Sequence, residues 1–325
     1  MNFEQCNPNG AVEGFCLIKT VEKKMTAKGI PFLDLSLADS SGEINAKLWD
    51  YKAEQHGEFT PNMLVKVRGT IAPFNDVPQL RVERIRPAEP QDEVRIEDFV
   101  PSSGEDSNAM YAALTECAEG FADADLKKLV LAILEEYKER LLYWPAAYRL
   151  HHAVRGGLLY HTLSILRLAQ RVAQVYPFVD CDLLFSGVML HDICKIEEYE
   201  VSLAGIASGY TTQGSLVGHL VRGAIVAERV GTQLEIPQEK LMLVQHMLIS
   251  HHGEPDFGAA MRPMFLEAEL LSQLDLMDAR VYEIMQAQNG VEPGGFSNKQ
   301  WMLDNRKIYN HGRGESEFAA NLIEE

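Results

Sequence analysis

The sequence predicts two domains of different class, a small all-β barrel followed by an all-α domain. Three observations support this prediction. Alternating and β-branched residues fill the first ninety positions, a polar stretch follows, and apolar residues then recur at steps of three and four from about residue 108. At 325 residues the chain is also longer than a typical single domain.

The first domain, expected over residues 1–87, contains five segments with strand-like patterning. In one of them Leu33, Leu35 and Leu37 alternate with Asp34 and Ser36. The expected strands cover residues 15–21, 31–37, 44–48, 64–71 and 78–85, with a short helix between residues 50 and 59. Five strands with a helix after the third form the layout of an OB-fold barrel, a fold that binds single-stranded nucleic acid.

The charge distribution makes this barrel the expected nucleic-acid contact. The net charge of -17 disfavours a polyanion spread over the whole surface, but residues 15–87 hold 11 Lys and Arg against 9 Asp and Glu. The rest of the chain holds 19 against 38. Candidate phosphate contacts on the strands are Lys47, Lys66, Arg68, Arg81 and Arg84, with the alternative that they only solubilise an exposed face.

Aromatic residues of the barrel have two interpretations. Phe32, Trp49, Phe59 and Phe74 could stack on bases, but aromatic residues in small barrels more often belong to the core.

Residues 88–107 are rich in Pro, Glu, Asp and Ser, and we expect them to form a linker. The helical domain is expected over residues 108–288, with later helices near 158–175, 182–198, 215–230, 238–252 and 265–288. Residues 289–325 form a C-terminal extension whose role the sequence does not indicate.

The cysteines and the hydropathy indicate a cytoplasmic protein. The five cysteines are odd in number, widely spaced and without a CxxC pair, which disfavours a disulfide framework and a zinc finger. No apolar run approaches the roughly 18 residues of a membrane span, and the N-terminus lacks a signal-peptide pattern. The oligomeric state is not decided by the sequence, and a homo-oligomer stays open.

Histidines and aspartates recur within the apolar stretches of the second domain. Such groups are costly to bury unless something pairs with them, and a divalent metal ion does so directly. A single buried histidine is more often a core residue than a ligand, but an ordered set favours a metal site. The set is His161, His191, Asp192, His219, His251, His252 and Asp275. Because no thiolate is included, a hard or borderline ion is expected in place of a structural zinc site. Our first expectation is Mn²⁺, with Fe²⁺, Co²⁺, Zn²⁺ or Mg²⁺ open, and the residues do not decide among them.

Five motifs in this order resemble the HD superfamily of metal phosphohydrolases. They are PAAYRLHHAVRGGLLYHT, LHDICK, GSLVGHL, LISHHGEPDFG and ELLSQLDLMDA. With the strand segment FLDLSLADSSGEINAKLWD and LVKVRGTI, which is similar to OB domains of the anticodon-binding type, the layout resembles the YhaM-type 3′-to-5′ exoribonucleases. This resemblance implies a metal-dependent exonuclease acting on single-stranded RNA, with DNA also open as a substrate.

The resemblance also implies roles for the site residues. His161, His191, Asp192 and Asp275 would hold one ion, and Asp192 would bridge to a second ion held by His219 and His251, with His252 as a further candidate. Lys195 lies three residues after Asp192, so we expect it to face the same cleft and to neutralise a phosphate oxygen. His151 and His152 are placed either in structural hydrogen bonds or in the cleft wall.

Two alternatives remain open at this point. One is an HD phosphohydrolase for a small or cyclic nucleotide, although the sequence HHGEPDFG lacks the Gly-Tyr-Pro element of the cyclic-dinucleotide branch. The other is a nucleic-acid-binding protein with a vestigial HD site.

Overall fold

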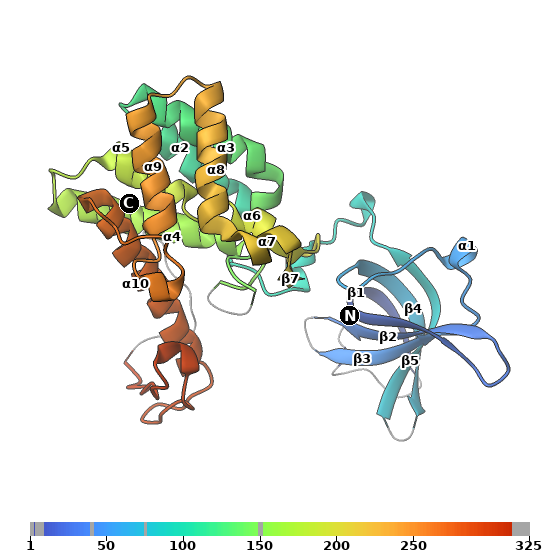
Figure 1. Ribbon diagram of the computed structural model, residues 1–325. Coiled ribbons are helices and arrows are strands. Elements are labelled where there is room, and N and C mark those ends of the chain that lie inside the picture. Colours follow the sequence, from blue (N-terminus) through green and yellow to red (C-terminus); the bar gives the residue numbers. More distant parts are fainter. Residues whose placement is uncertain (1–2, 4–9, 40–41, 75–76, 149–151, 314–325) are drawn as a thin grey trace. The chain divides into compact units, whose positions relative to one another are not determined.

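The computed structural model describes residue 3 and residues 10–39, 42–74, 77–148 and 152–313 (Figure 1). The chain divides into two compact units. One comprises Met1–Pro101 with Ser202–Ile206, and the other comprises Ser102–Val201 with Ala207–Glu325. The boundaries expected at residues 87 and 107 stay predictions.

The first unit is a closed five-stranded barrel. Its strands are β1 (Ala11–Met25), β2 (Pro31–Ala38), β3 (Glu43–Leu48), β4 (Leu64–Phe74) and β5 (Val77–Pro87), in the order β1–β2–β3–β5–β4. The first part of β1 pairs with β4, and its second part pairs with β2. Because β1 serves both neighbours, this one long strand closes the sheet and leaves no open edge.

Alternation along the strands produces the barrel core. In β2 Leu33, Leu35 and Leu37 are buried, as their period of two predicts, and Ala38 at the end of the strand is buried as well. A short helix, α1 (Ala53–His56), follows β3. The prediction of an OB-fold barrel, with five strands and a helix after the third, is therefore confirmed.

The segment after the barrel contains local structure. Two 3₁₀ turns, η2 (Pro90–Asp92) and η3 (Ile96–Asp98), follow β5. Val100 is buried with Leu17 of β1 and Ala204 in a small apolar cluster of the first unit. This part of the expected linker is thus anchored by apolar contacts.

The second unit consists mainly of helices around a central one. They are α2 (Ser107–Glu119), α3 (Ala124–Leu141), α4 (Gly157–Val175), α5 (Cys181–Leu190), α6 (Lys195–Glu198), α7 (Thr212–Leu216), α8 (Gly218–Gln233), α9 (Gln238–Ser250) and α10 (Leu266–Gln288). The short apolar helix α5 is largely buried and packs against α3, α4, α9 and α10. Its C-terminal end therefore lies inside the helical unit, where polar side chains must be paired.

The sequence-based helix over residues 182–198 is wrong in one respect. α5 ends at Leu190, residues 191–194 form turns, and α6 begins at Lys195, so His191 and Asp192 do not lie within a helix. A second departure is a two-stranded hairpin, β6 (Tyr199–Val201) and β7 (Ala207–Tyr210). The expected helix over 215–230 is also divided, because Gly218, the first residue of α8, has a positive φ of 72°.

The described part of the C-terminal extension folds back on itself after α10. Isolated bridges join Phe296 to Tyr309 and Gln300 to Arg306, and the Gln288 amide donates to the Tyr309 carbonyl. A 3₁₀ turn, η5 (Trp301–Leu303), lies between these bridges. Trp301 is exposed, so this segment folds back through main-chain contacts more than through burial of that ring.

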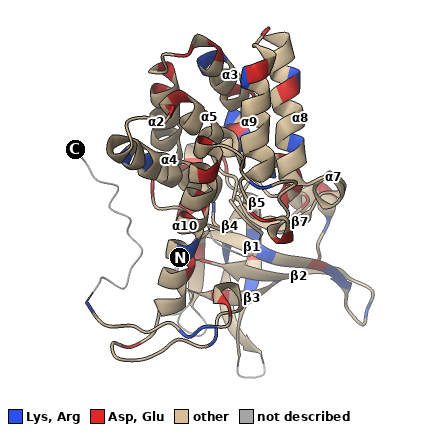
Figure 2. Ribbon diagram, turned by 60° about the vertical axis from the view of Figure 1, so that its left-hand side comes forward, with Lys and Arg blue, Asp and Glu red and all other residues tan. Residues whose placement is uncertain are grey.

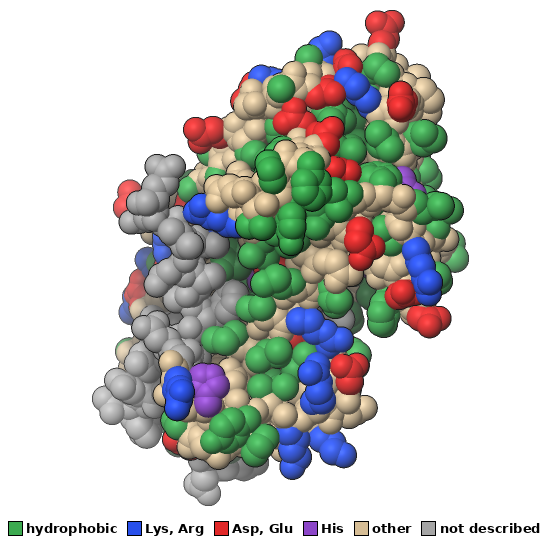
Figure 3. All heavy atoms as spheres, turned by 90° about the vertical axis from the view of Figure 1, so that its left-hand side faces the viewer, with side chains coloured by type: hydrophobic (Ala, Val, Ile, Leu, Met, Phe, Trp, Pro, Cys, Tyr) green, Lys and Arg blue, Asp and Glu red, His purple; other side chains and the backbone are tan. Residues whose placement is uncertain are grey.

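The surface carries both acidic residues and exposed hydrophobic side chains. Asp and Glu positions are spread over the helices of the second unit (Figure 2). Figure 3 shows one face on which hydrophobic side chains gather between charged ones. Among the described residues, none of the helices combines the length and the apolar character needed to cross a bilayer.

A glycine at the start of α4 gives the first prediction. A Cβ on Gly157 would lie 2.0 Å from the His152 carbonyl oxygen, which is backbone and cannot move aside easily. Helix propensity alone would make Ala more stable than Gly here, but the clash outweighs this gain. Gly157→Ala should therefore lower the free energy of unfolding by about 1–3 kcal/mol. Urea unfolding followed by circular dichroism measures the change.

Gly223→Ala in α8 is the matched control. A Cβ there would meet Leu248 Cδ1 at an ordinary 3.5 Å, so the propensity gain of up to about 1 kcal/mol should appear. If both variants stabilise the chain equally, the close backbone contact at Gly157 does not exist.

Candidate metal centre

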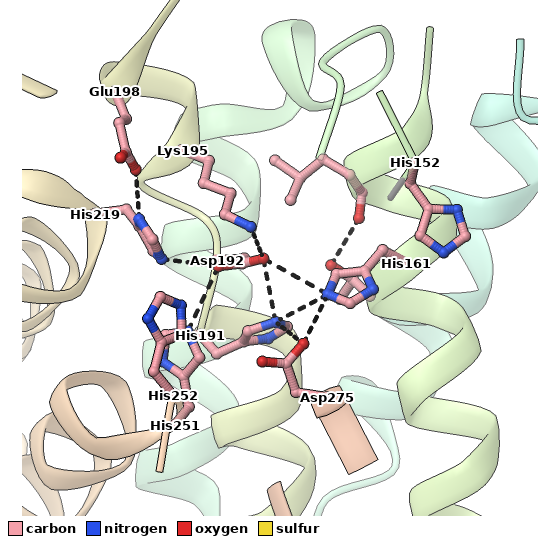
Figure 4. Close-up of polar contacts among 12 residues, drawn as sticks. His152, His161, His191, Asp192, Lys195, Glu198, His219, His251, His252 and Asp275 are labelled. Carbon is pink, nitrogen blue, oxygen red and sulfur yellow. Dashed lines mark hydrogen bonds and ion pairs between the residues drawn. The ribbon is translucent and has the colours of Figure 1, made fainter. Parts of the chain in front are cut away.

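Five segments far apart in the sequence bring the predicted set together (Figure 4). His161 comes from α4, His191 and Asp192 from the turn after α5, and His219 from α8. His251 and His252 follow the end of α9, and Asp275 lies in α10. Most of these side chains are buried, with His161 at 0% and Asp192 at 2% relative exposure.

Asp192 lies at the centre of the cluster, and its two oxygens face different neighbours. Oδ1 is 3.2 Å from His219 Nε2 and 3.6 Å from His251 Nε2. Oδ2 is 3.4 Å from His191 Nε2 and 3.6 Å from His161 Nε2. One carboxylate therefore connects two separate pairs of imidazoles.

Asp275 completes the side of the cluster that contains His161. Its Oδ1 is 3.1 Å from His161 Nε2 and 3.9 Å from His191 Nε2. The two Nε2 atoms are themselves 3.4 Å apart. Two imidazole nitrogens and oxygens of two carboxylates thus converge, which is a donor set suited to a divalent transition ion.

Backbone carbonyls orient three of the histidine rings. Nδ1 of His191 lies 2.8 Å from the Val188 oxygen, and Nδ1 of His251 lies 2.8 Å from the Leu248 oxygen. Nδ1 of His252 is likewise 2.8 Å from the Phe257 oxygen. A carbonyl can only accept, so the proton lies on Nδ1 and the Nε2 lone pair is available in each neutral ring.

Carboxylates orient the other two rings. Asp278 Oδ2 lies 2.8 Å from His161 Nδ1, and Glu198 accepts from His219 Nδ1. The sequence alone did not single out either acid. Asp278 lies three residues after Asp275, and Glu198 lies three residues after Lys195, but this helix-neighbour spacing does not single out two of the 47 acidic residues.

Three buried atoms in the cluster have no hydrogen-bond partner among the described residues. They are Asp192 Oδ1, His219 Nε2 and His251 Nε2. Buried polar atoms are normally satisfied, and leaving one unpaired costs about 1–3 kcal/mol. An acceptor and two imidazole nitrogens that converge without hydrogen bonds fit a metal ion well.

The pKa directions agree with a site that holds cations. Burial lowers the pKa of His251 to about 3, so this ring is neutral. Burial has the same effect on His161, but hydrogen bonds to Asp275 and Asp278 outweigh it and raise its pKa to about 10. A cation, either a proton or a metal ion, is therefore favoured between His161 Nε2 and Asp275.

Lys195 faces the cluster as expected. Its Nζ lies 2.6 Å from Asp192 Oδ2, and the side chain is buried. Burial disfavours the ammonium form, but Asp192 outweighs this effect and raises the pKa of Lys195. Burial would raise the pKa of Asp192, whereas Lys195 and His191 hold it well below its usual range, so both groups are charged.

The charge of the cluster is strongly negative when its imidazoles are neutral, which is the state in which they can bind a metal ion. Four carboxylates, those of Asp192, Glu198, Asp275 and Asp278, surround one lysine ammonium. With neutral imidazoles, three negative charges are uncompensated inside a low-dielectric interior, which is unfavourable unless cations bind.

His152 forms a structural hydrogen bond, which was one of the two roles expected for it. Its Nε2 lies 3.0 Å from Asp278 Oδ2, so it hydrogen-bonds to the acid behind His161. His151 lies outside the described residues.

The five barrel cations lie on the outer surface of three adjacent strands. Lys47 is on β3, Lys66 and Arg68 are on β4, and Arg81 and Arg84 are on β5. The register places Lys47 beside Arg81 and Arg68 beside Arg84.

Two of these cations remain available for a ligand. Lys47 pairs with Asp34 at 2.5 Å, while Lys66 and Arg68 approach Glu13 and Glu83 at 3.6 and 3.8 Å. Within the described parts of the chain, Arg81 and Arg84 form no ion pair. Lys66, Arg68 and Arg84 also line a shallow cavity of about 490 Å³.

The barrel aromatics divide between the two interpretations. Phe59 is buried in the core at 8% exposure, whereas Trp49 and Phe74 are exposed at 42% and 63%. The ring of Phe32 lies 4.7 Å from that of Trp49.

Family models match the helical unit. The HD domain model matches residues 158–280, a range that contains the whole cluster from His161 to Asp278. A second model, described as a putative helicase, matches residues 114–181.

Relatives match almost the full chain. The 3′-5′ exoribonuclease YhaM of Bacillus licheniformis is 36% identical over 299 residues, which are 92% of this chain and 94% of that protein. The protein of the same name from Bacillus subtilis is 34% identical over 92% of this chain and 94% of its own. A structure of a replication protein A heterotrimer bound to ssDNA matches 26% of this chain and 62% of its own chain. The identity is 20% and the TM-score is 0.22, so the assignment of the barrel depends on its own strand order and not on this likeness. The chain belongs to the YhaM family of 3′-5′ exoribonucleases, and its helical unit carries an HD domain.

Proposed function

We propose that this protein is a 3′-to-5′ exoribonuclease that uses two divalent ions, with Asp192 as the bridging ligand. The observation that carries the proposal is the division of the Asp192 oxygens between two pairs of imidazoles. The names of its relatives support the substrate and the polarity of the reaction.

The proposed ligands form two groups. His161, His191 and Asp275 would hold one ion with Asp192 Oδ2, and His219 and His251 would hold the other with Oδ1. His252 is a further ligand of the second ion, since its nitrogen lies within 4.8 Å of those of His219 and His251. Imidazoles and carboxylates without a thiolate favour a hard or borderline divalent metal, and among these we propose Mn²⁺.

Charge supports two ions over one. One divalent ion would leave the cluster negative, whereas two would more than offset its three uncompensated negative charges. Only the second state attracts a phosphodiester anion.

The ions and the side chains would have different roles in hydrolysis of the phosphodiester. When bound, the ions would polarise the scissile phosphate and acidify a water molecule. The carboxylates of Asp192 and Asp275 would hold the ions in place. The five oriented imidazole rings would offer them neutral Nε2 lone pairs. Lys195, held beside Asp192 at 2.6 Å, would neutralise a phosphate oxygen as negative charge develops.

The barrel would bind the RNA strand. Its cations at Lys47, Lys66, Arg68, Arg81 and Arg84 lie on adjacent strands, and the segment is slightly basic in an acidic chain. Such weak positive charge predicts modest, salt-sensitive affinity. We also propose the cytoplasm as the site of action, since the four described cysteines are free thiols.

The direct test of the proposed function is digestion of single-stranded RNA labelled at its 5′ end, with Mn²⁺ present. We expect stepwise shortening of the labelled strand and release of mononucleotides, and no activity after chelation. The same sequence as DNA and a set of free and cyclic nucleotides are the comparison substrates. Turnover of the small nucleotides without digestion of RNA would contradict the proposal and favour a small-nucleotide phosphohydrolase.

Asp192→Asn should remove activity through loss of metal. An amide presents one neutral oxygen and an N–H group that opposes a cation, so we expect at least about a 100-fold fall in kcat and fewer bound ions per chain. Activity assays and metal analysis by mass spectrometry measure the two effects. Asp182→Asn is the matched control, because Asp182 of α5 accepts from the Asp123 main chain and lies outside the cluster; an equal loss in both variants would contradict the assignment.

The double variant Arg81→Gln and Arg84→Gln should weaken RNA binding without changing the chemical step. We expect KM to rise with kcat unchanged, and the slope of log affinity against log salt to fall by about 0.7 for each lost phosphate contact. Arg95→Gln, an exposed cation paired with Asp98, is the control. An unchanged salt slope in the double variant would remove these two arginines from the binding surface.

A further inference from the structure

In each of the two proposed ligand groups, the Nδ1 atom of one histidine contacts a carboxylate. The Nδ1 atoms of the other three histidines contact backbone carbonyls. We propose that Asp278 and Glu198 are positioning residues, each controlling the affinity of one ion through the histidine it contacts. Asp278 acts through His161 and Glu198 acts through His219. This inference rests on the two-ion site proposed above.

Asp278 is fully engaged by donors and is thus a support, not a ligand. Its Oδ2 accepts from His161 Nδ1 at 2.8 Å and from His152 Nε2 at 3.0 Å, and its Oδ1 accepts from Ser164 Oγ. The residue is 7% exposed. Three donors on one buried carboxylate fix its orientation and leave His161 Nε2 directed toward Asp192 and Asp275.

The backbone around His152 holds this arrangement in place. His152 has a φ of 52°, a left-handed conformation that costs energy for a residue with a side chain. Its carbonyl accepts from the Ala146 N–H at 3.1 Å and approaches Gly157 closely. The contact of the His152 main chain with Ala146 thus fixes the residue whose Nε2 lies 3.0 Å from Asp278 Oδ2.

Glu198 is held by a different part of the unit. It ends the four-residue helix α6, which is too short to be stable alone. The Trp144 indole donates to the Lys195 carbonyl at 3.0 Å, and the Thr211 N–H donates to the Glu198 carbonyl at 2.9 Å. Both ends of α6 are therefore fixed, and the Glu198 side chain meets His219 Nδ1 on the side of the ring away from Asp192 (Figure 4).

A carboxylate at Nδ1 of a histidine strengthens metal binding more than a backbone carbonyl does. Its full negative charge makes the ring a stronger donor to a cation, and it excludes the tautomer that would place a proton on Nε2. An amide in its place removes the charge and can turn its N–H₂ toward Nδ1, which favours the wrong tautomer. Losing such a partner typically lowers metal affinity about 10- to 100-fold.

The test uses Asp278→Asn, Glu198→Gln and the double variant of the full chain. The variants are dialysed against graded free Mn²⁺, and the ions bound per chain are counted by mass spectrometry, with the thermal midpoint recorded beside them. In each single variant we expect one ion to bind about 10- to 100-fold more weakly and the other to bind as in the wild type. In the double variant we expect both ions to weaken.

Matched controls separate positioning from general damage to the fold. Glu283→Gln changes another buried acid of α10, paired with Arg280, and Glu228→Gln changes an acid of α8 that accepts from Gln245. Both controls should keep two tight ions.

The outcomes distinguish the inference from the function on which it rests. If the wild type binds fewer than two ions, the proposed two-ion function fails. If the wild type binds two and both single variants match it, the function stands and this inference is overturned. Equal weakening in the controls would also overturn it.

Discussion

The buried carboxylate of Asp192 constrains the whole helical unit. It is 2% exposed, with Lys195 and imidazoles around it, and it sits at the end of α5, the helix on which α3, α4, α9 and α10 pack. A charge in this position is tolerable only if every neighbour is fixed in a suitable state. The turns at the ends of α5 and α9, and the short helix α6, place those neighbours.

Much of the site could be predicted because residue type alone limits the possibilities. Histidines and aspartates in apolar stretches have few satisfactory environments, so His161, His219 and Asp275 were identifiable before any contact was known. Asp278 and Glu198 were not, since the sequence holds 47 acidic residues and nothing local separates a support for histidine from a solvated acid. Only the packing of α10 against α4, and of α6 beside α8, makes that distinction.

The same reasoning explains the fold. Period-two alternation predicted the barrel, since one face of each strand must be buried, and the helical spacing predicted the second unit. The break after Leu190 was missed because Ile193, Cys194 and Ile196 continue the apolar pattern past the turn, and periodicity does not register a change in main-chain direction. The aromatics were ambiguous for a related reason, as Phe59 and Trp49 differ in burial but not in local pattern.

The proposed chemistry depends most on Asp192 binding two ions at once. Crystals grown with Mn²⁺ and measured at an anomalous wavelength test this directly. We expect two anomalous peaks roughly 3.5–4 Å apart, one beside His161 and Asp275 and one beside His219 and His251, with the Asp192 carboxylate between them. A single peak beside His161 and Asp275, with none near His219 and His251 at saturating Mn²⁺, would contradict this expectation.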